Sequence, residues 1–189
     1  MAQPAPARVY LTVEEFEQYD VPDDMQAELV RGELRLIPLP GFRHGALATR
    51  VARLLDAFVE PNRLGTVTVG SGYVLAALPR TVRGPDIAFV SASRLPPDME
   101  AERIARFRPD LAIEILSPSE PASRLDEKLA DYRAAGIPLA WVVDGSSRTV
   151  TVVTLRGAPR TLHHDDVLDG GTILPGFSCR VGDLFEGLR

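Results

Sequence analysis

The sequence predicts an α/β domain with a mixed sheet flanked by helices, and three observations favour this class. Strand-like apolar segments are interspersed with segments of helical periodicity, which is unlike an all-β sandwich. The chain has 189 residues, 45% of them hydrophobic, which suffices for one large core and is too apolar for a disordered chain. A single cysteine and the lack of a repeat exclude disulfide-rich and fibrous proteins.

The first half of the sequence predicts two helices and five strands. A capping box over residues 12–15 starts a short helix that continues to about residue 19. Apolar residues recur at helical spacing from Leu47 to Phe58, which predicts an amphipathic helix of roughly 16 residues ended by Pro61. The strands are expected at residues 25–30, 33–37, 66–69, 72–77 and 86–90.

The second half begins with residues 91–109, which are polar, contain proline and indicate a long loop with one helical turn. A helix is expected from about residue 122 to 135, with Pro121 near its start and Gly136 just after its end. The remaining segments are expected as strands at 111–116, 139–143 and 150–155, and as a closing strand or loop with a short turn at 173–185. We expect residues 1–10 to form a frayed tail and residues 11–189 one domain.

No apolar run approaches the roughly 20 residues that a membrane-spanning helix needs. The first eight residues do not combine a basic start with an apolar stretch, so they do not resemble a signal peptide. Cys179 stands alone and cannot form an internal disulfide, which fits a reducing compartment. We therefore expect a cytoplasmic protein with no membrane partner.

Charge is distributed unevenly along the chain, whose formal net charge is −5. Residues 1–33 contain eight acids and two arginines, whereas the rest has 18 acids against 19 bases. Affinity for DNA that is independent of sequence comes mainly from neutralised phosphates. The composition therefore argues against strong nonspecific DNA binding, although it allows a local basic cleft.

Glu114 lies within the strongly apolar segment 111–116. Both faces of this segment are apolar, as in a central strand covered on each side. Glutamate is rarely buried unless it is paired or bound to a metal. Because the chain has 20 arginines, an arginine partner is the structural alternative to a functional site.

Asp86 follows Pro85 and begins another apolar segment, where it shares a strand face with Ala88 and Val90. An aspartate that completes a turn is the structural alternative. If Asp86 and Glu114 stand at matching heights on neighbouring strands, they repel each other unless a cation lies between them. Oxygen ligands of this kind favour Mg²⁺ or Mn²⁺.

Lys128 is the only lysine in the chain. Lysine carries a compact charge on a flexible stem, which arginine cannot replace. In the predicted helix Lys128 lies in the apolar stripe of Leu125, Leu129 and Tyr132. The positions expected to point outward are Arg124, Asp131 and Arg133. An inward lysine must either snorkel to the surface or find a carboxylate, and this helix directly follows the strand of Glu114.

These residues form an ordered series that resembles the PD-(D/E)XK nuclease superfamily and, more narrowly, the Uma-two family of restriction-endonuclease-like proteins. The series is Pro85-Asp86, then Glu114-Ile115-Leu116, then Lys128 with Tyr132 and Gly136, then Trp141 to Asp144. The likeness extends to residues 28–34, His44 and residues 174–177. It thus covers most of the chain.

The resemblance implies a restriction endonuclease-like PD-(D/E)XK core in a homodimer that hydrolyses DNA phosphodiester bonds with Mg²⁺ or Mn²⁺. Asp86, Glu114 and the backbone carbonyl of Ile115 would hold the metal. The lysine of the E-x-K pattern would fall at Leu116, and the resemblance implies that Lys128 takes its place.

The resemblance also implies roles for four side chains. Lys128 would orient the attacking water or stabilise charge on the phosphorane. Glu28 would act through water on a second ion. His44 would contact phosphate or assist proton transfer, with a helix cap as the alternative. Tyr132 would reach the site through its hydroxyl, with packing as the alternative.

Two other functions fit the same residues. One is a catalytically weak or inactive nuclease-fold module for binding or regulation, which the acidic N-terminal segment favours. The other is a phosphatase or related hydrolase that uses the same carboxylates.

Three features are set apart from the candidate site. Residues 163–166 (His-His-Asp-Asp) read as a polar loop, because adjacent histidines in a strand point to opposite faces. Cys179 reads as a small, partly buried side chain. The segment with Arg94, Arg103, Arg106 and Arg108 reads as a solvated loop or as a flap that contacts phosphate.

Overall fold

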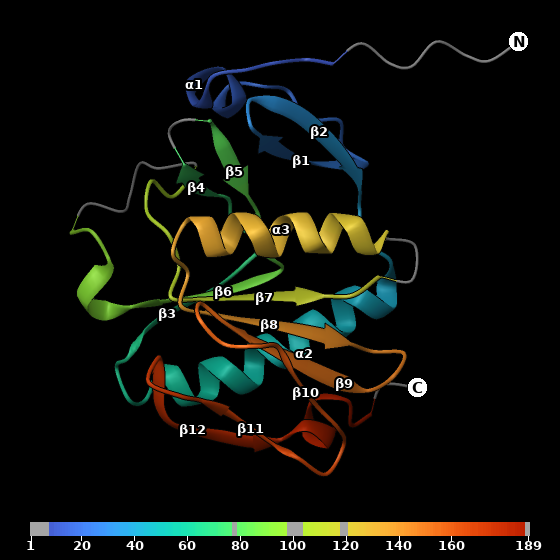
Figure 1. Cartoon of the computed structure of the whole chain (residues 1–189), viewed down its shortest axis with the longest axis vertical. Helices are drawn as coiled ribbons and strands as arrows, with labels where there is room; N and C mark the ends of the chain where they lie inside the picture. Colours follow the sequence, from blue (N-terminus) through green and yellow to red (C-terminus); the bar gives the residue numbers. More distant parts are fainter. Residues whose placement is uncertain (1–7, 77–78, 98–103, 118–120, 188–189) are drawn as a thin grey trace, which may run out of the picture.

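The computed structural model describes residues 8–76, 79–97, 104–117 and 121–187 (Figure 1). Within these ranges the α-helices are α1 (Val13–Glu17), α2 (Phe42–Val59) and α3 (Ala122–Ala134), and 3-10 turns lie at Ala92–Arg94 and Val181–Leu184. The strands are β1 (Met25–Val30), β2 (Glu33–Pro38), β3 (Gly65–Val69), β4 (Tyr73–Ala76), β5 (Thr81–Arg83), β6 (Ile87–Ser91), β7 (Leu111–Ile115), β8 (Leu139–Asp144), β9 (Thr149–Thr154), β10 (Arg160–Leu162), β11 (Val167–Gly170) and β12 (Leu174–Arg180).

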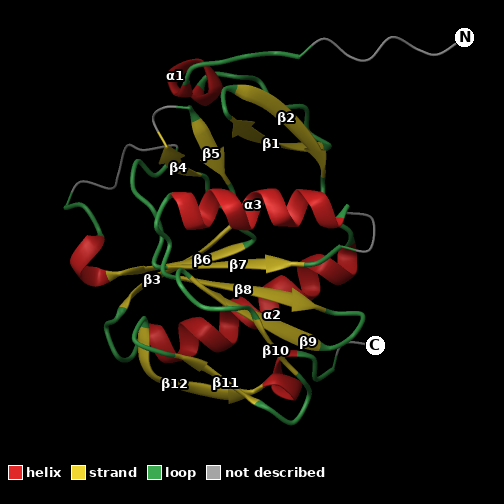
Figure 2. Ribbon diagram, viewed as in Figure 1, coloured by secondary structure: helices red, strands yellow, loops and turns green. Residues whose placement is uncertain are grey.

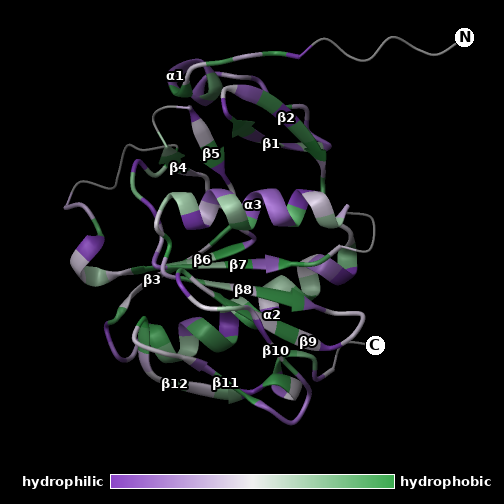
Figure 3. Ribbon diagram, viewed as in Figure 1, coloured by the Kyte–Doolittle hydropathy of each residue, from purple (hydrophilic) through white to green (hydrophobic). Residues whose placement is uncertain are grey.

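A six-stranded sheet in the order β10-β9-β8-β7-β6-β3 forms the centre of the molecule (Figure 2). β7 and β8 run parallel, and the other neighbouring strands run antiparallel. Every residue of β7 is buried, as expected for a central strand covered on both faces. The neighbouring strand β8 is also hydrophobic, as its green colour in Figure 3 shows. The mixed sheet with its helices confirms the predicted fold class.

Alternate side chains of β7 face two different layers. The odd-numbered residues pack in the main core with α2, whose apolar face repeats every four residues at Leu47, Val51, Leu55 and Val59. β11, β12 and the last 3-10 turn contribute to the same core. Ala112 packs instead with Tyr132 of α3. Because side chains alternate along a strand, Glu114 also faces α3.

A second sheet, in the order β2-β1-β5-β4, lies with α1 at the top of Figure 1. The capping box of α1 is confirmed, since the Thr12 hydroxyl accepts from the Glu15 N–H and the Glu15 carboxylate accepts from the Thr12 N–H. Val13 and Phe16 pack in a small separate core with β1 and β5. β5 continues through residues 84–86 into β6, so this sheet meets the central sheet where Asp86 stands.

Most predicted elements are confirmed, but β5, β10 and β11 were not predicted. Each has three or four residues, too few to show a periodic pattern. The expected loop 91–109 contains the turn at 92–94 and a bridge between Ala105 and Tyr73, and its residues 98–103 lie outside the described residues. Residue 77 of the expected strand 72–77 also lies outside them.

Residues 1–7 of the expected tail lie outside the described residues. Two residues that follow them contact β2. The carbonyl of Val9 accepts a hydrogen bond from the Leu34 N–H at 2.8 Å, and Tyr10 forms a bridge with Glu33. No helix in the described part of the chain is long and apolar enough to cross a membrane.

Candidate active site

Asp86 and Glu114 stand opposite each other at one edge of two antiparallel strands. Ile87 pairs with Ile113, so the register places Asp86, one residue before β6, opposite Glu114. The Ile115 N–H donates to Asp86 Oδ2 at 2.7 Å, which fixes the aspartate against β7. The strand register thus places the two carboxylates at the same level of the sheet, as expected from the sequence.

Glu114 is buried, with 4% of its surface exposed. Lys128 Nζ donates to its Oε2 at 2.8 Å, and the Tyr132 hydroxyl donates to its Oε1. Burial raises the pKa of Glu114 to about 7, the nearby ammonium of Lys128 opposes that shift, and the charge of Asp86 adds to it. The partners seen in the described residues are therefore a lysine and a tyrosine, not the arginine of the structural alternative.

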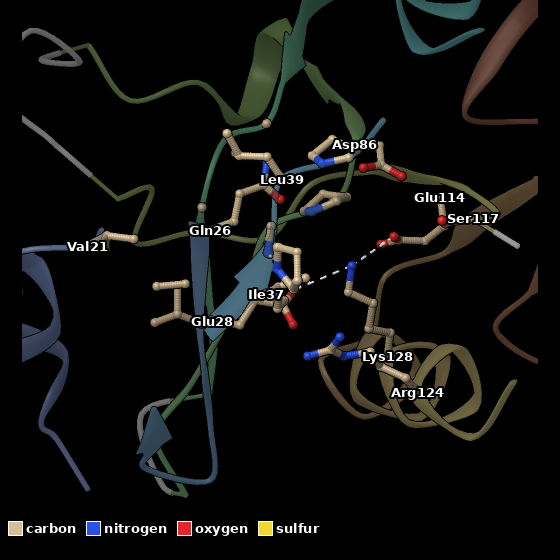
Figure 4. Close-up of a pocket in the computed structure, with 18 of the residues that line it drawn as sticks. Val21, Gln26, Glu28, Ile37, Leu39, Asp86, Glu114, Ser117, Arg124 and Lys128 are labelled. Atoms are coloured by element: carbon tan, nitrogen blue, oxygen red, sulfur yellow. Dashed lines mark hydrogen bonds and ion pairs between the residues drawn. The ribbon is translucent and has the colours of Figure 1, made fainter. Parts of the chain in front are cut away.

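Lys128 lies between two buried carboxylates. Its Nζ is 2.8 Å from Glu114 Oε2 and 3.3 Å from Glu28 Oε1 (Figure 4). Burial alone would lower the pKa of this ammonium, but the charges of Glu114 and Glu28 raise it above its ordinary value. Lys128 is 7% exposed, so it does not snorkel to the surface.

His44, in the first turn of α2, contacts Asp86. Its Nε2 lies 3.2 Å from Asp86 Oδ2. The hydrogen bond to Asp86 raises the pKa of His44, and partial burial opposes the shift. Nδ1 is buried and has no hydrogen-bond partner among the described residues. His44 therefore belongs to the carboxylate cluster, and the structure gives it no helix-capping bond.

Arg83, on β5, completes the cluster and was not predicted. It is fully buried. Its Nη1 donates to Glu28 Oε2 at 2.8 Å, while its Nε and Nη2 donate to Asp131 Oδ2 at 2.9 and 2.6 Å. The expected outward orientation of Asp131 on α3 is therefore wrong, because a buried guanidinium draws its carboxylate inward. An arginine three residues before Asp86 was the available signal, but the three residues of β5 carry no periodic pattern.

A pocket of about 680 Å³ lies between α3 and the N-terminal sheet (Figure 4). Its wall includes Glu28, His44, Asp86, Glu114, Ser117, Arg124 and Lys128. The lining also includes residues of α1, β1 and the end of β2, among them Phe16 and Ile37. Arg124 thus faces the pocket, which corrects its expected outward position. Tyr132 is not part of the lining, and its hydroxyl reaches the site through the hydrogen bond to Glu114.

The sequence matches the Uma2 family, described as "Putative restriction endonuclease", over residues 13–182. The chain belongs to the Uma2 (Uma-two) family. A solved structure described as "a putative nuclease belonging to DUF820 from Anabaena variabilis ATCC 29413" resembles it with a TM-score of 0.84 and 21% identity, over 95% of this chain and 99% of that chain. At this identity the likeness establishes the fold. A comparison with curated proteins finds no match.

In this Uma2 protein, the E-x-K position is occupied by Leu116, whose N–H donates to the Val143 carbonyl at 2.9 Å. Leu116 cannot supply a cation. The structure instead brings the ammonium of Lys128 to Glu114 from α3, which follows β7 in the chain.

The donor chemistry of the Uma2 site fits a divalent metal. Asp86 and Glu114 supply hard carboxylate oxygens from opposed positions and line the same pocket. Within the described ranges, no group of three or more His, Cys, Asp or Glu side chains is arranged to hold a metal alone. A backbone carbonyl such as that of Ile115, together with water, would complete the set, and Mg²⁺ usually keeps several waters.

Two of the features that were set apart lie away from this site. Residues 163–166 connect β10 and β11, and His164 Nδ1 lies 3.1 Å from Asp165 Oδ1, which confirms a polar loop. Cys179 is half-buried, and burial raises the pKa of its thiol to about 11.

Two of the four arginines in residues 91–109 contact carboxylates of the fold. Arg94 pairs with Asp110 at 3.2 Å, and Arg106 pairs with two glutamates of α1. Arg108 lies near Gly136, at the far end of α3. Arg103 lies outside the described residues. Neither Arg94, Arg106 nor Arg108 lines the pocket, so a flap that contacts phosphate remains only a hypothesis.

Proposed function

We propose that this Uma2 protein is a metal-dependent endonuclease that hydrolyses phosphodiester bonds of DNA. The observation that carries the proposal is the opposed pair Asp86 and Glu114, with Lys128 bound to Glu114 in the same pocket. Two carboxylates beside one cation are the groups needed to hold a divalent metal and to stabilise charge on a phosphorane.

Asp86, Glu114 and the Ile115 carbonyl would hold Mg²⁺ or Mn²⁺, and such an ion polarises the scissile phosphate and lowers the pKa of its bound water. The Ile115 N–H keeps Asp86 in place through its hydrogen bond. Tyr132 fixes the second oxygen of Glu114. The side chains that would hold the metal are therefore oriented by hydrogen bonds within the protein.

Lys128 supplies the positive charge for the phosphate oxygens or orients the attacking water. His44 is suited to hold a proton near the phosphate, because its contact with Asp86 favours the charged imidazolium. Glu28 is assigned to the site as well, where its carboxylate accepts from Arg83, Lys128 and the Gly84 N–H.

Cleavage of a supercoiled plasmid in Mg²⁺ or Mn²⁺ tests the proposal. Asp86→Asn and Glu114→Gln should each abolish nicking while the circular dichroism spectrum is kept. Asp126→Asn, on the exposed face of α3, is the matched carboxylate control and should cleave normally. Cleavage by Asp86→Asn at the rate of the parent protein would overturn the mechanism.

One observation favours a second candidate, a nuclease-fold module that binds without cleaving. Both oxygens of Glu114 already accept hydrogen bonds from Lys128 and Tyr132, and a very tight pair would compete with a metal. Calorimetric titration with Mn²⁺ separates the two functions, since an intact fold that takes up no Mn²⁺ fits only the binding module. Turnover of small phosphoesters instead of DNA would indicate a phosphatase.

We further propose a cytoplasmic homodimer, in which a two-fold arrangement would suit cleavage of both strands of a duplex. Sedimentation equilibrium of the purified protein tests the assembly. A single species with the mass of one chain at micromolar concentration would exclude it.

A further inference from the structure

The ammonium of Lys128 has a second partner from a different sheet. Glu28, on β1, places Oε1 3.3 Å from Lys128 Nζ. Both residues are buried, at 3% and 7% exposed. A lysine side chain has four rotatable bonds, so one contact with Glu114 would leave the direction of the ammonium poorly defined. A second carboxylate on the other side restricts it.

Glu28 is itself held in place. Arg83 Nη1 donates to Glu28 Oε2 at 2.8 Å, and the Gly84 N–H donates to Oε1 at 3.3 Å. The other edge of the guanidinium binds Asp131, which lies three residues after Lys128 on α3. The planar, permanently charged guanidinium therefore links β1 to the helix that carries the lysine.

The charges also explain why Lys128 lies closer to Glu114 than to Glu28. Glu28 and Glu114 compete for a single ammonium in a buried region. Arg83 neutralises Glu28, which reduces its attraction for Lys128 and leaves the shorter contact, 2.8 Å, with Glu114. Without Arg83, Glu28 would lose the contact that fixes it, and the ammonium would lose a fixed second partner.

We infer that Arg83 and Glu28 are positioning residues: Arg83 fixes Glu28, and Glu28 together with Glu114 holds the Lys128 ammonium in one place between the two carboxylates. The kinetic part of this inference rests on the proposed nuclease function, whereas the structural part does not. In this inference Glu28 positions Lys128. It does not bind a second metal ion, either directly or through water.

Because Lys128 is the only lysine, labelling with ¹⁵N- and ¹³C-lysine gives one side-chain signal in the full-length protein. In the parent protein we expect a slowly exchanging Nζ ammonium cross peak and a rigid Cε. Glu28→Gln and Arg83→Met should lose this cross peak and increase Cε motion. Arg35→Met is the matched control, because the Arg35 guanidinium pairs with Glu127 of the same helix and with Glu33, and within the described residues it has no ion pair with Glu28.

For plasmid cleavage, we expect Glu28→Gln to lower kcat at least about tenfold, since small displacements of a reacting group are costly. KM should stay within about twofold, because Glu28 itself does not contact substrate in this scheme. If Arg83→Met fails to fold, Glu28→Gln carries the test alone, since glutamine keeps the size of the side chain.

Three outcomes would overturn the inference. An unchanged, ordered lysine signal in folded Glu28→Gln would show that Glu28 does not position Lys128, and the same signal in folded Arg83→Met would exclude Arg83. Loss of one bound Mn²⁺ per chain in Glu28→Gln, measured by calorimetry, would make Glu28 a metal ligand. If the parent protein cleaves no DNA, the proposed function fails while the lysine signal still decides the positioning role.

Discussion

Replacing Glu114 by glutamine should make the protein more stable at alkaline pH. In the folded chain, burial raises the pKa of Glu114 from its ordinary value of 4.5 to about 7. Between these values the folded state binds a proton that the unfolded chain has released, so the free energy of unfolding falls as the pH rises. Each pKa unit corresponds to about 1.4 kcal/mol, so Glu114 should lower stability by about 3 kcal/mol between pH 4.5 and 8. Because Glu114 is only 4% exposed, solvent screening reduces this value little.

Urea denaturation in the presence of a chelator measures the effect. Other carboxyl groups also titrate in this range, so the useful quantity is the difference in unfolding free energy between the parent protein and Glu114→Gln. The difference should be near zero at pH 4.5, where the protonated glutamate resembles glutamine. At pH 8 the variant should be more stable by about 3 kcal/mol. Asp126→Asn, which removes an exposed carboxylate from the same helix, is the matched control.

A difference that stays within about 0.5 kcal/mol from pH 4.5 to 8 would refute this reasoning. It would mean that the ion pair with Lys128 fully offsets the burial of Glu114. A parent protein that becomes more stable than Glu114→Gln as the pH rises would refute the sign as well, because the pKa of Glu114 would then lie below 4.5.

Three further predictions concern the framework and can be measured by urea or thermal denaturation. Thr12→Ala should lower the unfolding free energy by about 1 kcal/mol through loss of the capping box of α1, whereas Thr12→Ser should keep it. Gly65→Ala should cost at least about 2 kcal/mol, because its Cβ would meet the Val90 carbonyl oxygen at 2.0 Å with φ at +155°. The same change at Gly45, in α2 with open space around it, should instead stabilise by about 0.5–1 kcal/mol, and an equal loss at both sites would contradict the steric argument. Leu168 is fully buried in the main core, so Leu168→Ala should lower the free energy of unfolding by about 2–5 kcal/mol. A loss below about 1 kcal/mol would indicate that neighbouring side chains fill the cavity.

The sequence predicted those parts of the fold that leave a local pattern. α2 repeats apolar residues every four positions, and the apolar strand around Glu114 could only be central. The same logic left two outcomes for a lysine on the inner face of α3, snorkelling or a carboxylate partner, and the structure shows the second. Apolar runs and periodic spacing are local properties of the sequence, so a single sequence is enough to detect them.

The contacts that could not be predicted all depend on registers between distant segments. Arg83 and Glu28 are 55 positions apart, and β5, which brings them together, has only three residues. Asp131 points inward because Arg83 binds its carboxylate. The helical pattern of α3 alone places position 131 on the solvent-exposed face. A buried guanidinium attracts the carboxylates near it. The residues that flank Arg83 in the sequence, however, do not indicate that Arg83 is buried.

The position of the lysine explains why this site depends on the small sheet. A lysine two residues after Glu114 would lie on the same face of the same strand, and the pleat alone would fix its distance. Leu116 occupies that position, so the ammonium comes from α3, and its placement depends on how the helix packs. Helix packing fixes a side chain less tightly than a strand pleat does, which makes an additional contact necessary. Glu28 provides that contact from β1, and Arg83 joins β1 to α3. On this argument, restoring a lysine at position 116 (Leu116→Lys) should make activity less sensitive to Glu28→Gln.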